Sequence, residues 1–256
     1  MNRPIRAIVY GVGAMGSIMT RLLLDKGVDI VGAIGRSPNK VGQDLGDVAK
    51  IGRKLGVIVE NDAKAVLSRK ADIAIVSVGS FLKTMSRHFK LCLEHGTNVV
   101  TIEEETIFPW TTEKELAAQL DSTAKSNGVT LAASGAQDVF WMKQVAVLMG
   151  AAHKIDSVQG KCSWNADEYG PEVTSHIHAG ETIEAFEKHL ATHGWPEFVA
   201  RATMEALVAD AFLTVKNISS KVHPIIAKKD TYSLSMESTI KTGYMLGITD
   251  TTTIST

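Results

Sequence analysis

The sequence predicts an α/β protein in which a doubly wound parallel sheet is followed by a smaller α+β domain. Short apolar segments alternate with amphipathic segments of helical length along residues 1–135, which is the pattern of repeated βαβ units. A glycine-rich turn directly follows the first apolar segment. The alternation stops at about residue 136. We therefore expect one domain over residues 1–135 and a second over residues 136–256.

The elements of the first domain are predicted from periodicity and from the glycines that end several segments. Runs rich in valine, isoleucine and alanine predict strands over residues 6–12, 28–35, 71–80, 97–102 and 129–135. Apolar residues recurring every three or four positions predict helices. These helices are expected over residues 14–27, 61–70, 81–96 and 112–128. Glycine follows naturally at a helix end because it adopts the left-handed conformation needed there.

The second domain has a weaker pattern. We expect helices over residues 138–152, 181–194 and 196–218, and a strand over residues 154–164. The large side chains of Phe140, Trp141 and Met142 are expected in the core of the first of these helices. The threonine-rich tail over residues 248–256 does not resemble a packed element. There we expect the chain to be frayed or incomplete.

Composition excludes several classes of protein. The 256 residues carry a net charge of −1, so no global charge favours nucleic acid or an anionic membrane. The two cysteines, Cys92 and Cys162, are far apart, which fits a reducing compartment. No apolar run is long enough to span a bilayer, and the N-terminus lacks the pattern of a signal peptide. We therefore expect a cytoplasmic protein that binds neither nucleic acid nor a membrane.

The glycine-rich turn GVGAMG is the strongest functional signal. Gly11, Gly13 and Gly16 have the G-x-G-x-x-G spacing between a predicted strand and a predicted helix, as in the Rossmann dinucleotide-binding fold. The first glycine permits the tight turn, the second lets the backbone approach a pyrophosphate, and the third lets helix and strand pack closely. With Ala14 and Met15, the turn would offer backbone N–H groups to the phosphates. The alternative is a glycine turn without a ligand.

The end of the second strand indicates which dinucleotide is bound. An NAD site usually places an acidic residue there to bind the ribose 2′-hydroxyl. This strand instead ends in Gly35, Arg36 and Ser37, with Lys40 close behind. A guanidinium suits a 2′-phosphate, so these residues favour NADP(H), with NAD(H) as a second cofactor. The alternative is that Arg36 is a solvated loop residue.

Small residues and acids follow the next two strands. Ser77, Val78 and Gly79 stand where the ribose or nicotinamide would pass, and Glu103, Glu104 and Glu105 close the fourth strand. Ligands of open α/β sheets bind outside the carboxyl ends of the strands, so the acids are expected beside the nicotinamide. If the strand continues to its end, Glu103 and Glu105 face away from Glu104. A solvated acidic turn is the alternative.

A pair of histidines, His176 and His178, is expected on a strand or extended loop, where both would share one face. A metal site needs a third ligand, which the sequence does not offer. We therefore predict no metal and two ordinary polar contacts, with a role in orienting substrate as the functional alternative.

In these motifs the chain resembles the amine dehydrogenase and 2,4-diaminopentanoate dehydrogenase family of the dihydrodipicolinate reductase-like superfamily. The resemblance covers most of residues 1–180. It rests on GVGAMG and on the segments over residues 31–48, 104–110 (EETIFPW) and 134–143 (SGAQDVFWMK). It implies an NAD(P)H-dependent oxidoreductase that interconverts an amine with a ketone or aldehyde plus ammonia, and a homodimer.

The resemblance also implies that the first acid of the matched pair, Glu104, is catalytic. The residues expected to line the substrate pocket are Glu105, Gln137, Phe140, Trp141, His176 and His178. Two alternatives remain open. One is an NADP-dependent dehydrogenase of another small carbonyl or amino-acid substrate, and the other is a non-catalytic NADP-binding sensor.

Overall fold

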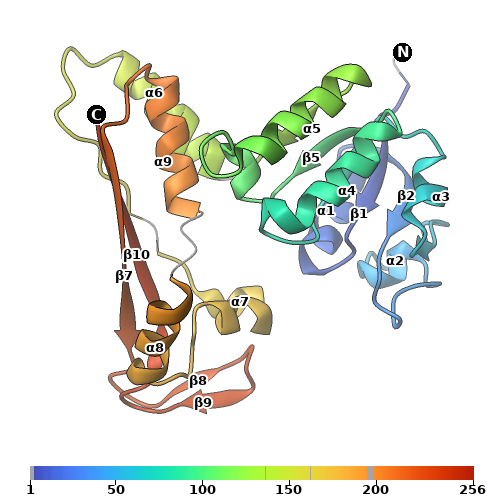
Figure 1. Ribbon diagram of the computed structural model, residues 1–256. Helices are drawn as coiled ribbons and strands as arrows, with labels where there is room; N and C mark the ends of the chain where they lie inside the picture. The colour runs from blue at the N-terminus through green and yellow to red at the C-terminus, as the bar shows by residue number, and fades with distance from the viewer. Residues whose placement is uncertain (1–2, 136, 162, 195–198) are drawn as a thin grey trace. The chain divides into compact units, whose positions relative to one another are not determined.

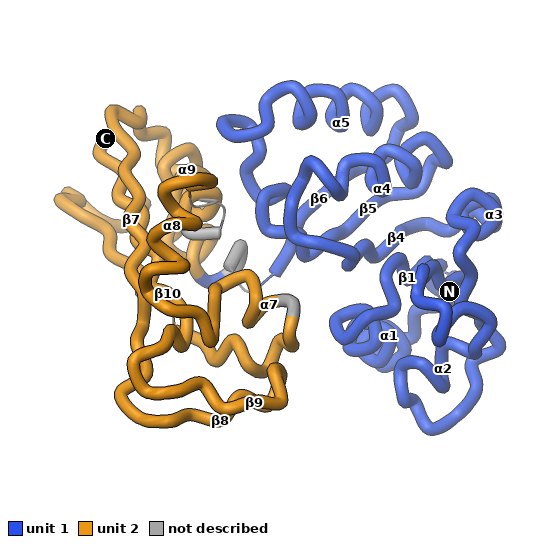
Figure 2. The backbone as a smooth tube through the Cα atoms, turned by 60° about the horizontal axis from the view of Figure 1, so that its bottom comes forward, with its two compact units in different colours: residues 1–140 blue, residues 141–256 orange. Residues whose placement is uncertain are grey.

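The computed structural model describes residues 3–135, 137–161, 163–194 and 199–256, apart from the side chains of residues 137–139, 172 and 199–200. The chain forms two compact units, which divide between Phe140 and Trp141 (Figure 2). The predicted boundary after residue 135 lies slightly before this division. Each unit has its own secondary structure (Figure 1).

The first unit contains a six-stranded sheet in the order β3-β2-β1-β4-β5-β6, with every neighbouring pair parallel. The strands are β1 (Arg6–Tyr10), β2 (Asp29–Ile34), β3 (Val59–Glu60), β4 (Ile73–Val76), β5 (Asn98–Thr101) and β6 (Leu131–Ala133). This is the doubly wound strand order, and the predicted fold class is confirmed. The sequence analysis missed β3, because two residues are too few to show any periodicity.

Helices cover both faces of this sheet. They are α1 (Ala14–Asp25), α2 (Leu45–Val48), α3 (Ala63–Leu67), α4 (Leu82–Glu94) and α5 (Lys114–Ser126). Alternation along β1 assigns the faces, since Ile8 and Tyr10 belong to the core cluster with α4 and α5 while Val9 belongs to the cluster with α1. Helix α4 turns Met85 and Phe89 into the first cluster at helical spacing.

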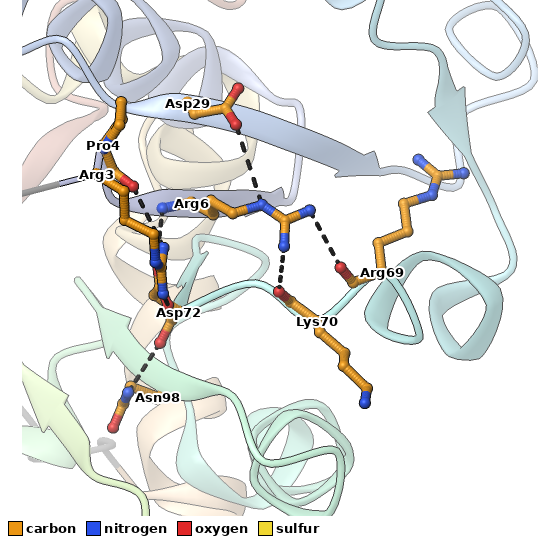
Figure 3. Close-up of polar contacts among 8 residues, drawn as sticks. All are labelled: Arg3, Pro4, Arg6, Asp29, Arg69, Lys70, Asp72 and Asn98. Carbon is orange, nitrogen blue, oxygen red and sulfur yellow. Dashed lines mark hydrogen bonds and ion pairs between the residues drawn. The ribbon is translucent and has the colours of Figure 1, made fainter.

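Ion pairs and hydrogen bonds tie the strands together at their amino ends (Figure 3). The Asp72 carboxylate accepts two bonds from the Arg3 guanidinium, at 2.7 and 2.6 Å, and a third from the backbone N–H of Arg6 at 2.8 Å. The Arg6 guanidinium lies 4.0 Å from Asp29, and the Asn98 amide donates to the Asp72 carbonyl. The hydrogen bonds from Arg3 hold the pKa of Asp72 well below its usual range.

The second unit combines short helices with two antiparallel pairs of strands. Its helices are α6 (Gln144–Gly150), η3 (Ala166–Tyr169), α7 (Pro171–His176), α8 (Ile183–His193) and α9 (Val199–Asp210). A π-helical segment, η2 (Gln137–Lys143), precedes α6. Strands β7 (Asn217–Ile226) and β10 (Met245–Ser255) form a long ribbon, and β8 (Thr231–Ser233) pairs with β9 (Ser238–Ile240). An α+β second region was predicted.

Several element predictions for the second unit were wrong. Residues 154–161 and 163–164 form no strand, and Lys154 and Asp156 pair with each other in solvent instead. The predicted helix over residues 196–218 ends at Asp210, and β7 begins at Asn217. The threonine-rich tail is not frayed but is paired with β7 along β10, because β-branched residues favour extended structure once a partner strand is present.

Of the residues Phe140, Trp141 and Met142, which were expected in the core, two are packed and one is exposed. Met142 is buried, and the half-buried Trp141 ring lies against Gly160. The prediction for Phe140 was wrong, since 59% of its surface is exposed. Within the described part of the chain, no helix has the length and apolar character needed to cross a membrane.

Candidate active site

The glycine turn lies at the carboxyl end of β1 and leads into α1. Gly11 has φ +103°, and a Cβ placed there would lie 2.4 Å from the Ser77 carbonyl oxygen. A Cβ on Gly16 would lie 1.8 Å from the carbonyl oxygen of Gly11. Gly13 differs, because a Cβ there would have no heavy atom within 4 Å. Packing within the chain therefore explains the first and third glycines, and the open space at the second suits an approaching pyrophosphate.

Side chains hold the carbonyl groups of this turn. The Ser77 hydroxyl donates to the Gly11 carbonyl at 3.2 Å, and the Lys40 ammonium donates to the Val12 carbonyl at 2.8 Å. Lys40, expected at the cofactor, thus contacts the turn itself. Ala14 and Met15 are exposed in the first turn of α1, where N–H groups have no partner within the helix. The turn fits a dinucleotide phosphate on these grounds.

The end of β2 carries a cation. Arg36 and Ser37 are exposed directly after the strand. In the described ranges, the Arg36 guanidinium takes part in no hydrogen bond or ion pair. Its charge is therefore available to a ligand at the edge where the glycine turn lies.

Glu105 has a local structural task. Its Oε2 atom accepts a hydrogen bond of 2.6 Å from the backbone N–H of Leu82, the first residue of α4. This satisfies one of the donors that every helix leaves free at its start. Val78 and Gly79 lie in the preceding segment, between β4 and α4, so Glu105 connects the ends of two strands.

Glu103 also has a structural task. Its carboxylate is 1% exposed and accepts hydrogen bonds from the backbone N–H groups of Glu105, at 3.0 Å, and Thr106, at 2.9 Å, and from the Thr106 hydroxyl. These bonds hold the short 3-10 helix η1 (Glu105–Ile107). Burial raises the pKa of Glu103 to about 7, while the Thr106 hydroxyl acts in the opposite direction.

Glu104 is the remaining acid. No hydrogen-bond partner for its buried Oε2 atom occurs among the residues that the structure describes. Burial raises the pKa of its carboxyl group, and the Ser80 side chain opposes that effect. An unpaired carboxylate oxygen away from water is costly, so this atom is an obvious point for a cationic ligand.

The predicted side-chain alternation along the three acids was wrong. Strand β5 ends at Thr101, whose hydroxyl donates to the Val76 carbonyl and accepts from the N–H of Glu103. The chain turns there, so the acids do not alternate as strand residues do. Glu104 differs from Glu103 and Glu105 because the carboxylates of those two residues accept capping hydrogen bonds.

The two histidines do not share the face of a strand, so that prediction was also wrong. His176 is exposed at the end of α7, a helix that begins at Pro171, a residue favoured in the first turn. His178 follows at φ +58° and is 9% exposed, with Nδ1 3.1 Å from Glu181 Oε2. Its ring lies against His189, which sequence analysis missed although α8 repeats histidine at helical spacing.

The predicted substrate pocket stays a prediction. The side chain of Gln137 lies outside the described residues, and Trp141, His176 and His178 belong to the second unit. Among the described residues, no three histidine, cysteine, aspartate or glutamate side chains lie together so that they could hold a metal ion.

A partly buried polar pair near the glycine turn was missed by sequence analysis. The Tyr10 hydroxyl, at the end of β1, lies 2.7 Å from Nδ1 of His88 on α4. The two rings meet edge to face with centroids 5.2 Å apart. No sequence signal joins two residues that are 78 positions apart, and only the packing of α4 on β1 brings them together.

The strand order and the glycine turn together define a Rossmann-type dinucleotide-binding unit. The amine dehydrogenase from Mycobacterium smegmatis is 47% identical to this chain, with a TM-score of 0.93 over 99% of this chain and 75% of that one. This chain belongs to the amine dehydrogenase family, which confirms the resemblance.

A second comparison agrees with this assignment, and a third shows the fold alone. The 2,4-diaminopentanoate dehydrogenase of Acetoanaerobium sticklandii is 28% identical over 232 residues, and the chain spans 65% of that relative's length and matches it over 88% of its own. A biliverdin reductase from Synechocystis, solved with biliverdin and NADP+, shares the fold at 15% identity and a TM-score of 0.57, over 98% of this chain and 68% of that one. No family model matches the sequence.

Proposed function

We propose that this protein is an NAD(P)H-dependent oxidoreductase that interconverts an amine with a ketone or aldehyde plus ammonia. The names of its relatives support this activity. The observation that carries it is Glu104, whose buried carboxylate has an oxygen without a partner in the described part of the chain. A carboxylate in this state suits an ammonium or iminium group, which brings the missing positive charge.

The cofactor is proposed to lie along the carboxyl edge of the sheet. The turn from Gly11 to Gly16 and the first N–H groups of α1 would hold its pyrophosphate. Arg36 and Ser37 would hold a 2′-phosphate, which favours NADP(H) over NAD(H). When bound, the nicotinamide ring supplies or accepts the hydride.

Glu104 is proposed to hold the nitrogen of the substrate and to accept or return its proton. Burial raises the pKa of the carboxyl group, which makes it a better base, whereas an ammonium beside it lowers the pKa again. Glu103 and Glu105 are less suited to this role because their oxygens already cap η1 and α4. The structure thus offers a physical reason to prefer the middle acid.

The decisive variant is Glu104→Gln, which keeps the shape of the side chain and removes the charge. If Glu104 transfers protons, its rate of NADPH-dependent amination should fall on the order of 10²–10⁴-fold. NADPH affinity, measured by fluorescence titration, should not change. Glu105→Gln is the matched control, since its amide oxygen can still accept from the N–H of Leu82, and it should retain most of the activity.

The outcomes separate the alternatives. A Glu104→Gln protein with full activity would refute the assignment. An inactive Glu105→Gln or Glu103→Gln protein of normal stability would instead assign the proton transfer to the residue that was changed. Binding of NADPH without turnover of any ketone or aldehyde, with or without ammonia, would favour a sensor. The cytoplasmic location and the homodimer also stay predictions, the latter to be checked by analytical ultracentrifugation.

A further inference from the structure

Three side chains form a hydrogen-bonded row beside the glycine turn. Tyr10 contacts Nδ1 of His88 at 2.7 Å, and Nε of Arg87 donates to Nε2 of His88 at 3.3 Å. Tyr10 ends β1, whereas His88 and Arg87 lie in the second turn of α4. The row therefore runs from inside the first unit to an exposed guanidinium.

The chemistry of Arg87 fixes the protonation of His88. A guanidinium can only donate, so Nε2 of His88 must be the acceptor and carry no proton. The proton of the neutral ring then sits on Nδ1 and is donated to the Tyr10 oxygen. Burial lowers the pKa of His88, and the charges of Arg87 and Arg36 lower it further. A neutral imidazole can thus hold the Arg87 guanidinium in place.

Arg36 and Arg87 approach this imidazole from different elements. Arg87 donates to it from α4, and Arg36 follows β2 two residues after Ile34, which pairs with Tyr10 on β1. Within the described ranges, neither guanidinium forms an ion pair with a carboxylate. Two such cations repel each other unless an anion lies near both, and guanidinium groups bind the oxygens of a phosphate group particularly well.

We propose that Arg87 is a second arginine of the site for the 2′-phosphate of NADP(H), opposite Arg36, and that His88 positions its guanidinium. This proposal rests on the proposed preference for NADP(H). Arg36 alone is the contact that the β2 position suggests. The second arginine, Arg87, comes from α4 and is held there by the Tyr10–His88–Arg87 row.

The test compares adenosine 2′,5′-bisphosphate (2′,5′-ADP) with adenosine 5′-monophosphate (AMP), two probes that differ only in the 2′-phosphate, by calorimetric titration of the full chain. In the parent protein 2′,5′-ADP should bind more tightly. Arg87→Met should reduce the ratio of the two affinities about tenfold and leave the affinity for AMP unchanged. Arg87 is exposed on a helix, so the variant should fold normally.

Lys90→Met is the matched control on the same helix. It removes the same charge, but Lys90 lies 3.8 Å from Glu94, so the ratio should stay at the parent value. His88→Leu should lower the ratio because Arg87 loses its acceptor. His88→Gln should restore part of it, since an amide oxygen can accept from Nε of Arg87, whereas a role in packing alone would not give this rescue.

The failures are distinguishable. If the parent binds both probes equally, the NADP(H) preference and this inference fall together. If Arg36→Met removes the preference and Arg87→Met leaves it intact, only the inference is overturned. If Arg87→Met weakens the binding of AMP and 2′,5′-ADP equally, Arg87 contacts the part that both probes share and the inference is overturned as well.

Discussion

The two edges of the sheet in the first unit carry their charges in opposite ways. At the amino edge, each oxygen of Asp72 accepts at least one hydrogen bond, and Arg3 and Arg6 supply the donors. At the carboxyl edge, Glu104 keeps a buried oxygen without a partner in the described residues, and Arg36, after β2, forms no ion pair there. The difference supports the proposal that the carboxyl edge keeps polar groups for a ligand.

The largest expected effect comes from closing the open space in the glycine turn. Gly13→Ala would fill a volume that no heavy atom within 4 Å occupies and that a pyrophosphate needs. NADPH affinity should fall on the order of tenfold to 100-fold, while the temperature of thermal unfolding stays constant. Gly11→Ala should differ, since its Cβ meets the Ser77 carbonyl at 2.4 Å and the fold itself should lose stability. Equal behaviour of the two variants would contradict this view of the turn.

The second expected effect concerns cofactor preference. Arg36→Ala should cost NADPH about tenfold in affinity, the size of one charge-assisted contact, and should leave NADH nearly unchanged. Parallel fluorescence titrations with both cofactors give the ratio. An unaltered ratio would show that the free cation at the end of β2 does not recognise the 2′-phosphate.

Whether the sequence predicts a feature of these two edges depends on how far apart in the sequence the interacting residues lie. The glycine turn was predictable because its three glycines act within six residues and between two strongly periodic segments. The capping bonds of Glu103 and Glu105 were not predictable. They depend on the turn of the chain after Thr101 and on the N-terminus of α4, which lies beside that turn. The Tyr10–His88 pair depends on packing across 78 positions, and no local pattern reports such a contact.

The third prediction sharpens the comparison at the amino edge. Asp72→Asn should lower the temperature of thermal unfolding by a few degrees and leave NADPH affinity unchanged. Because the pKa of Asp72 is lowered by folding, its stabilising effect is present above the unfolded-state value of about 4 and is lost as the pH falls further. The difference in unfolding temperature between parent and variant should therefore be complete at pH 7 and become steadily smaller as the pH falls below about 4. A difference that does not depend on pH would contradict the ionic explanation.

The smallest expected effect has the opposite sign and belongs to Glu104. Folding raises the pKa of this carboxyl group, so its ionised form is less stable in the folded protein than in the unfolded chain. The stabilising effect of the protonated form is complete below about pH 4 and is lost as the pH rises through the folded pKa. Glu104→Gln should therefore raise the unfolding temperature by one or two degrees at pH 8, with no gain at pH 4.

Glu94→Gln is the control for this measurement, because that carboxylate is about half exposed and should change little at either pH. Calorimetry of both variants decides the matter. If Glu104→Gln is less stable than the parent at pH 8, the carboxylate is already satisfied within the fold. The carboxyl edge would then resemble the amino edge, and the argument that Glu104 is kept for a cationic substrate would lose its physical basis.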